Sequence, residues 1–350
     1  LDEVNALPED GRSPIWEASG AAIVACAQHS STLTSAVQGK ERHALAIQFL
    51  LCCSLDRTLK RVMWTDVPCR NVLLHACQLE SQSEQDCRES AFLTLSNMAR
   101  ARGNGNSMWG HTVIRRVLAT ACKEGPLSVR AEALGLLQRL LRGSELVSGE
   151  FWADVELRQA VIDAAELGDA DAVICRRFAV GCLAHAGAAF PDVWNHSDSR
   201  RAILNASELR DPQTRTIALA GICALSNLLT HESLRHRMWD NVQCRRALVR
   251  AMDSDGLNIT FKMISFGNLE SLALQPRIRA EMALDTQVLQ GAVKASGSGD
   301  KEAVSAGANL LIVLARSPSH KSTVWTALSA TLAPTLESDG AQIDYLLELL

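Results

Sequence analysis

The sequence lacks long apolar runs, and it lacks an excess of charge of one sign. Its longest apolar stretches, such as the one from Leu45 to Leu55, are broken by polar residues before they reach the roughly 18 residues that a membrane span needs. The formal net charge is −4, with acidic and basic residues mixed along the chain. This balance gives no long-range attraction to a nucleic-acid backbone. We therefore predict no membrane span and no nucleic-acid partner.

Motifs typical of catalysis or metal binding are also absent from the sequence. It contains no glycine-rich phosphate loop, no CxxC pair, no HExxH and no GxSxG. His231 and His236 lie near each other, but no carboxylate or cysteine cluster accompanies them, so a metal site is not expected. The prediction is a protein that is not an enzyme and that binds neither a cofactor nor a metal.

The eleven cysteines show no paired spacing, and only Cys52 and Cys53 are neighbours. An odd count without paired spacing favours a reducing compartment over a disulfide framework. Most cysteines stand on apolar helix faces, and both they and the neighbouring pair are predicted to be buried thiols, among them Cys26, Cys77, Cys122, Cys182 and Cys223. The predicted location is the cytoplasm, with the nucleus as the alternative.

What the sequence does contain is a long internal repeat marked by tryptophan. All seven tryptophans share one register, with intervals of 48, 45, 43, 42, 45 and 86 residues: Trp16, Trp64, Trp109, Trp152, Trp194, Trp239 and Trp325. The last interval is two periods of 43, and Met282 stands where the intervening member is expected. A repeat of this length predicts a solenoid of stacked helical units.

Each unit has the same internal order. Five units carry an arginine six residues after the tryptophan: Arg70, Arg115, Arg158, Arg200 and Arg245. An apolar pair at helical spacing, a polar loop and a second apolar helix with small residues follow. The small residues allow the close helix packing that stacked repeats need.

This order of a short entry segment, a middle helix, a loop and a final helix resembles the armadillo repeat. The segments LSNM from Leu95 and LSNL from Leu225 look like its third-helix signature, and the HEAT repeat is the near alternative. The resemblance covers residues 15–350 and implies an all-α, right-handed solenoid of about eight repeats. The predicted units are 15–62, 63–107, 108–150, 151–192, 193–237, 238–280, 281–323 and 324–350, the last truncated, with residues 1–14 as a linker or the end of a preceding repeat.

The resemblance also implies a concave groove lined by third helices. Counting back eleven residues from the start of each unit, or ten in the unit that starts at 281, gives a row of positions that armadillo peptide binders fill with asparagine: Cys52, Asn97, Leu140, Cys182, Asn227, Ser271 and Val313. Only two are asparagine, so the grip of nuclear-import adaptors on basic peptides is not implied. The predicted partner-binding residues are Asn97, Arg100, Arg139, Asn227, His231 and Ser271, although the two asparagines are equally well explained as solvated helix-surface residues.

Two readings of the tryptophans and arginines stay open. The tryptophans fall in the first-helix position, which the general armadillo pattern does not require, and we expect them to pack between repeats rather than to form a binding stripe. The arginine row forms either a basic edge stripe for an acidic peptide or phosphate, or a set of stacking and surface-pairing residues, and the second reading is favoured.

The leading functional hypothesis is a non-enzymatic scaffold that binds an extended peptide or partner helix in the groove. The alternative is a regulatory or substrate-docking solenoid of a larger enzyme, such as a ligase or kinase, whose catalytic part lies outside these residues. In either case we expect a monomer or a part of a larger chain.

Overall fold

The computed structural model describes residues 16, 20–30, 36–168, 170–209, 214–252 and 259–327. Within these ranges every regular element is a helix, and no residue lies in a strand. The predicted segment 1–14 and the predicted final unit from residue 328 onward lie outside the described residues.

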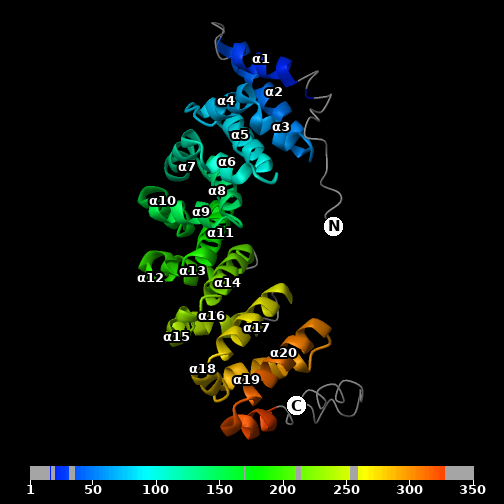
Figure 1. Ribbon diagram of the computed structural model, residues 1–350, viewed down its shortest axis with the longest axis vertical. Coiled ribbons are helices and arrows are strands. Elements are labelled where there is room, and N and C mark those ends of the chain that lie inside the picture. The colour runs from blue at the N-terminus through cyan, green and yellow to red at the C-terminus, as the bar shows by residue number, and fades with distance from the viewer. Residues whose placement is uncertain are drawn as a thin grey trace. The chain divides into compact units, whose positions relative to one another are not determined.

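The chain divides into two compact units, Leu1–Cys182 and Leu183–Leu350. Each unit is built from one kind of repeat, in which a short first helix carries the tryptophan and a second and a third helix follow (Figure 1).

In the first unit, the first helices are α3 (Leu59–Thr65), α6 (Asn104–Trp109) and α9 (Glu145–Ala153). The second helices are α1 (Ala21–Ser30), α4 (Val67–Ala76), α7 (Thr112–Glu124) and α10 (Val155–Ala165). The third helices are α2 (Ala36–Leu55), α5 (Gln85–Met98), α8 (Leu127–Leu141) and α11 (Val173–Ala189), of which α11 contains the boundary between the units. Two 3-10 turns, η3 (Gln82–Glu84) and η4 (Ala170–Ala172), lead into third helices.

In the second unit, the first helices are α12 (Asp192–Asn195), α15 (Glu232–Asp240) and α18 (Pro276–Met282). The second helices are α13 (Ser197–Glu208), α16 (Val242–Met252) and α19 (Thr286–Ser296). The third helices are α14 (Arg215–Leu229), α17 (Ile259–Ala273) and α20 (Lys301–Ala315). The turn η5 (Pro318–His320) precedes a last described helix at residues 321–327.

A capping side chain two residues after the tryptophan starts the second helix of a repeat directly after the first helix ends. Asp66 follows Trp64 by two residues, and its carboxylate accepts a hydrogen bond from the backbone N–H of Cys69 at 2.9 Å. Asp154 accepts in the same way from Leu157 at 3.0 Å. The equivalent caps in the second unit are His196, Asn241 and Asp285. Such caps satisfy N–H groups that have no partner within the helix.

The cap position corrects the register of the seventh repeat. Asp285 caps α19, so Ala283, two residues earlier, occupies the tryptophan position, and Met282 occupies the position before it. Met282 is fully buried, as are the residues that precede the tryptophans of the other repeats: Met63, Met108, Phe151, Val193 and Met238. The prediction that Met282 replaces the tryptophan is therefore wrong. Met282 corresponds to the large apolar residue that stands before every tryptophan, and Ala283 replaces the tryptophan itself.

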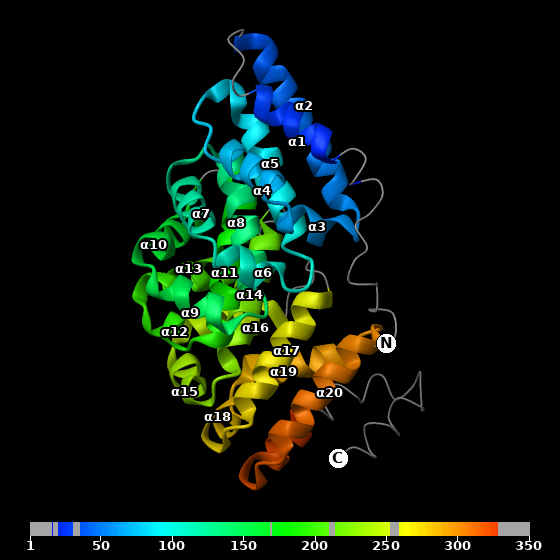
Figure 2. The same ribbon diagram turned by 45° about the horizontal axis from the view of Figure 1, so that its top comes forward.

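The third helices pack side by side in chain order. In the first unit α2 packs on α5 and α5 on α8, and in the second α14 packs on α17 and α17 on α20 (Figures 1 and 2). Small residues permit this closeness, as at Gly221 of α14, where an added Cβ would lie 2.6 Å from the backbone nitrogen of Ser207 in α13. The predicted all-α solenoid of stacked repeats is confirmed.

Candidate functional site

The tryptophans of the first helices link each repeat to the next one. Three indole N–H groups donate to a side chain two residues before the next tryptophan position: Trp64 Nε1 to Ser107 Oγ at 3.0 Å, Trp109 Nε1 to Glu150 Oε2 at 2.9 Å, and Trp239 Nε1 to Glu281 Oε2 at 2.8 Å. The rings of Trp64, Trp109, Trp194 and Trp239 are buried, whereas Trp152 is half-buried and Trp325 is exposed. The buried rings therefore serve packing between repeats rather than a surface stripe.

The arginines six residues after the tryptophans turn back onto them. Four guanidinium groups stand over the indole of their own repeat: Arg70 at 5.3 Å, Arg158 at 5.0 Å, Arg200 at 5.8 Å and Arg245 at 5.2 Å from the ring centroid. Arg70, Arg158 and Arg200 also donate to the tryptophan carbonyl. Arg115 instead pairs with Glu150 at 3.0 Å, the carboxylate that accepts from Trp109.

These contacts give the arginine row a structural role. A carbonyl in the last turn of a helix has no partner within that helix, and the guanidinium donates to it while stacking on the ring. Each of the five arginines is only half-buried. Their predicted role as a basic edge stripe for a ligand stays a prediction.

A shared burial pattern defines the outer face of the third helices. Five buried positions recur at x, x+1, x+3, x+4 and x+7, for example at Ala91, Phe92, Thr94, Leu95 and Met98 of α5. The same spacing starts at Ala133 in α8, Ala179 in α11, Gly221 in α14, Ser265 in α17 and Gly307 in α20. The residue before the last buried position is Asn97 in α5, a member of the predicted row.

This pattern corrects two members of the predicted row. In α8 the position belongs to Arg139, and Leu140 is buried; in α11 it belongs to His185, and Cys182 is buried. The predicted members Asn97, Asn227, Ser271 and Val313 are in register. Counting back from the tryptophans failed in α8 and α11, because the segment between the third helix and the next first helix varies in length.

Asn97 is 5% exposed, and its amide donates to Ser54 Oγ of α2 at 3.1 Å. Asn227 is half-buried and donates to the carbonyl of Ala184 at 2.7 Å. Both asparagines thus connect their third helix to the preceding one, which is a role that neither the groove reading nor the solvated-surface reading predicted.

Two other predicted residues lie at the same face of the second unit. The ring of His231, which follows α14, lies 3.1 Å through Nε2 from the carbonyl of Gly187. Ser271 of α17 donates to Gly267 within its own helix at 2.8 Å. His231 therefore contributes to contacts between repeats. The hydroxyl group of Ser271 bonds within its own helix instead.

Arg100 and Arg139 bring positive charge to the third-helix face of the first unit. Arg139 is half-buried, and Arg100 is exposed one turn beyond Asn97. Arg142, which the sequence prediction missed, is exposed one turn beyond Arg139, so it repeats the position of Arg100. Burial lowers the pKa of Arg139, and the charges of Arg100 and Arg142 lower it further, against the opposing charge of Glu132.

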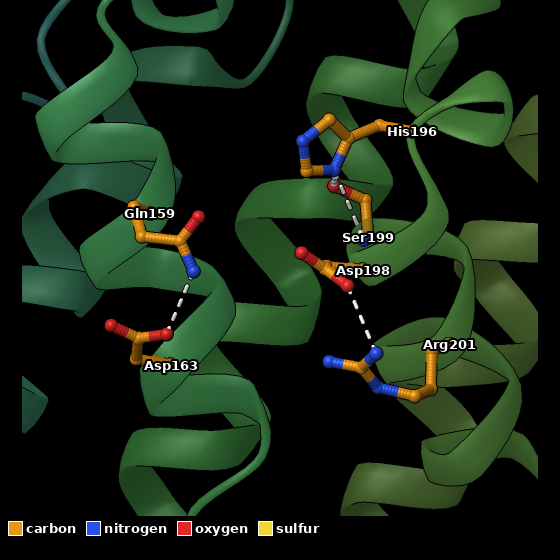
Figure 3. Close-up of polar contacts among 6 residues, drawn as sticks. All are labelled: Gln159, Asp163, His196, Asp198, Ser199 and Arg201. Carbon is orange, nitrogen blue, oxygen red and sulfur yellow. Dashed lines mark hydrogen bonds and ion pairs between the residues drawn. The ribbon is translucent and has the colours of Figure 1, made fainter.

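Some polar groups of the second helices α10 and α13 bond close by in the chain (Figure 3). In α10, Gln159 donates to Asp163 at 2.8 Å. In α13, Arg201 pairs with Asp198 at 2.9 Å, and the His196 cap lies 3.2 Å from Ser199 Oγ. Among the described residues, no group of three or more histidine, cysteine or acidic side chains could hold a metal ion.

The cysteines differ from the prediction at four positions. Cys77, Cys122 and Cys182 are buried, and burial raises the pKa of the Cys122 thiol to about 12. Cys26 and Cys52 are exposed, and Cys53 and Cys223 are half-buried. Cys52 and Cys53 have apolar neighbours in the sequence, which led to the wrong prediction that they are buried. Their side of α2 has no further described helix packed on it.

One helical stretch among the described residues, Ala170–Ala189, has the length and hydropathy of a membrane span, and 56% of it is buried inside the protein. A core helix passes the same test, so this stretch is weak evidence for a span.

No family model and no curated protein matches the chain. Among solved structures, it is similar to a designed armadillo repeat protein, with a TM-score of 0.54 and 12% identity over 71% of this chain and 99% of that chain. It is also similar to an engineered protein, with a TM-score of 0.52 and 14% identity over 93% of this chain and 86% of that chain. Identities this low inform on the fold alone. The chain therefore has an armadillo-like helical repeat fold, as its sequence resemblance implied.

Proposed function

We propose that the chain is a non-enzymatic protein-interaction scaffold that binds an extended peptide or a partner helix along its third helices. One observation carries the proposal: the burial pattern repeats in every third helix from α5 to α20, and from α8 to α20 it leaves the same position outside the core, whereas Asn97 at that position of α5 is buried. These positions hold different chemical groups, from Arg139 to Ser271 and Val313. Within each unit, equivalent positions with varied chemistry on successive third helices suit side-chain-by-side-chain recognition of a partner.

The test is to map where selected peptides bind. Peptides enriched from a random display library against the whole chain would be incubated with four variants, each carrying one photoreactive residue. Two variants place it on the third-helix face, at Arg100 and Ser271. Two controls place it on exposed second-helix positions, at Arg116 of α7 and Gln287 of α19.

Crosslinks are expected from Arg100 or Ser271 and not from the controls. Crosslinks confined to Arg116 and Gln287 would contradict the proposal, as would a library that yields no peptide enriched over an unrelated helical protein. Asn97 is unsuitable as a test position, because its buried amide bonds to Ser54 and a substitution there would perturb folding.

A further inference from the structure

The third-helix face of the first unit combines an apolar stripe with a group of arginines. On α2, four exposed side chains are spaced four, three and three residues apart and so share one face of the helix: Leu45, Phe49, Cys52 and Leu55. Leu45 is 65% exposed and Leu55 is 67% exposed. Side chains of this size on one helix face form an apolar patch that no described helix covers.

The arginines continue this face onto the next two third helices. Arg139 of α8 holds the position of Asn97 on α5, and the residues three further along are Arg142 and Arg100. Cys52 of α2 precedes Trp64 by as many residues as Asn97 precedes Trp109, and Leu55 lies three residues beyond it. Because α2 packs on α5 and α5 on α8, the apolar stripe and the arginines lie on neighbouring helices of one row (Figure 2).

The positive charge of the three arginines is only partly opposed in the described part of the chain, by Glu132 beside Arg139. None of them makes an ion pair with a carboxylate, in contrast to Arg115 and Arg201 on second helices. Their charges act on one another, since Arg100 and Arg142 both oppose the charge of Arg139. Like charges held close together are relieved by an anionic partner.

Two acidic residues of α8 and α5 form no ion pair with the three arginines in the part of the chain that the structure describes. Glu132 of α8 is half-buried, and burial followed by the charge of Glu89 raises the pKa of its carboxyl group. Glu89 of α5 accepts hydrogen bonds from Gln85 and Ser128, so it is already engaged between helices. The exposed apolar stripe of α2 offers no charge to a phosphate backbone but suits apolar side chains, which argues for a peptide over a nucleic acid.

We propose that the third-helix face of the first unit binds an acidic peptide that carries large apolar side chains, with the apolar residues on α2 and the carboxylates at Arg100, Arg139 and Arg142. This inference rests on the proposed scaffold function and specifies its partner. Adjacent packed helices are about 8–10 Å apart, so the three helices span roughly 20 Å, which an extended peptide of about six residues covers.

The experiment measures binding of fluorescein-labelled peptides of about twelve residues, twice the required span, to the whole chain by fluorescence anisotropy. The first peptide carries Phe and Leu at one end and Asp and Glu at the other. In the second, Asn and Gln replace the acids, and in the third, Lys replaces them. A single-stranded RNA of similar length is the nucleic-acid probe. The first peptide is expected to bind most tightly, and its affinity should fall with added salt.

Variants assign the contacts. Arg100→Gln combined with Arg142→Gln should weaken the acidic peptide by about threefold to tenfold, as expected for two exposed charge contacts. Arg61→Gln of α3 and Arg116→Gln of α7 are matched controls, because both arginines are exposed elsewhere on the first unit. Glu132→Gln should strengthen binding of the acidic peptide, a change of sign that general destabilisation would not produce. Leu45→Ser combined with Phe49→Ser should weaken the acidic and neutral peptides alike.

Circular dichroism would establish that each variant keeps its helix content. Equal affinity for acidic and neutral peptides, no effect of the arginine variants, or tighter binding of RNA would overturn the inference. If the neutral or basic peptide bound and the Leu45 and Phe49 variant lost it, the scaffold function would stand without the acidic partner. If no peptide bound this face, and the library selection also failed, both proposals would fall.

Discussion

An arginine and a tryptophan six residues apart act as one structural device in four repeats. The tryptophan is the penultimate residue of the first helix of its repeat, and the arginine lies in the second helix, one turn past the cap. The side chain folds back so that its guanidinium covers the indole ring, as with Arg200 over Trp194 at 5.8 Å. In that repeat it also donates to the Trp194 carbonyl at 2.9 Å. A sequence shows the spacing of six but not which way the side chain turns.

The indole hydrogen bonds between repeats should make a measurable contribution to the free energy of unfolding. Trp239→Phe removes the N–H group that Glu281 accepts at 2.8 Å. Trp194→Phe is the matched control in the same unit, because Arg237, which cannot accept a hydrogen bond, stands at the acceptor position. We expect Trp239→Phe to reduce the free energy of unfolding by about 1 kcal/mol more than Trp194→Phe does, as measured by urea denaturation. Equal losses would show that the indole hydrogen bond contributes nothing.

Thiol labelling should distinguish the exposed cysteines of α1 and α2 from the buried cysteines of the core. Exposed Cys26 and Cys52 are expected to react with a maleimide in the native protein. Cys77, Cys122 and Cys244 should stay unlabelled until the chain unfolds, since burial both hides them and raises their pKa values. Peptide mapping by mass spectrometry reads each site. Native labelling of Cys122 as fast as Cys52 would be incompatible with this packing.

At the scale of a helix, the sequence predicted the repeats well and their registers less well. The tryptophans, capping residues and helical spacing located the first, second and third helices, because each signal is local. The outer-face row was wrong in α8 and α11, where Arg139 and His185 replace Leu140 and Cys182. The row depends on which side of each third helix is covered by neighbouring helices, and the sequence does not show this. The number of residues between a third helix and the next tryptophan also varies, so counting back from the tryptophan does not find the same position in every repeat.

Two glycines of the second unit test how closely the helices pack. Gly221→Ala should destabilise the protein by about 1–3 kcal/mol, because the new Cβ would meet the backbone of Ser207 at 2.6 Å. Gly267→Ala in α17 should instead stabilise it by about 0.5–1 kcal/mol, because nothing lies within 4 Å of its added Cβ and alanine favours the helix. Thermal denaturation followed by circular dichroism compares them. A stabilising Gly221→Ala would mean that α13 and α14 are further apart than described.

At the scale of the whole molecule, stability should be local, because a repeat contacts mainly its neighbours in the chain. Trp239→Ala removes a ring that is 1% exposed and should cost about 3–5 kcal/mol. We expect hydrogen–deuterium exchange to accelerate in α15, α16 and α17 and to stay unchanged in α5 of the first unit. A uniform acceleration through both units would show that the chain unfolds as one cooperative body.

The uncovered position of the third helices has a consequence for how such a protein can change. Its occupants are Cys52, Asn97, Arg139, His185, Asn227, Ser271 and Val313: a thiol, amides, a cation, an imidazole, a hydroxyl and an aliphatic group. Wherever that side chain makes no contact between helices, a single codon change alters the exposed chemistry of one repeat and leaves the core of the fold untouched. Under the proposed scaffold function, the choice of partner therefore changes repeat by repeat during evolution, without a loss of folding stability.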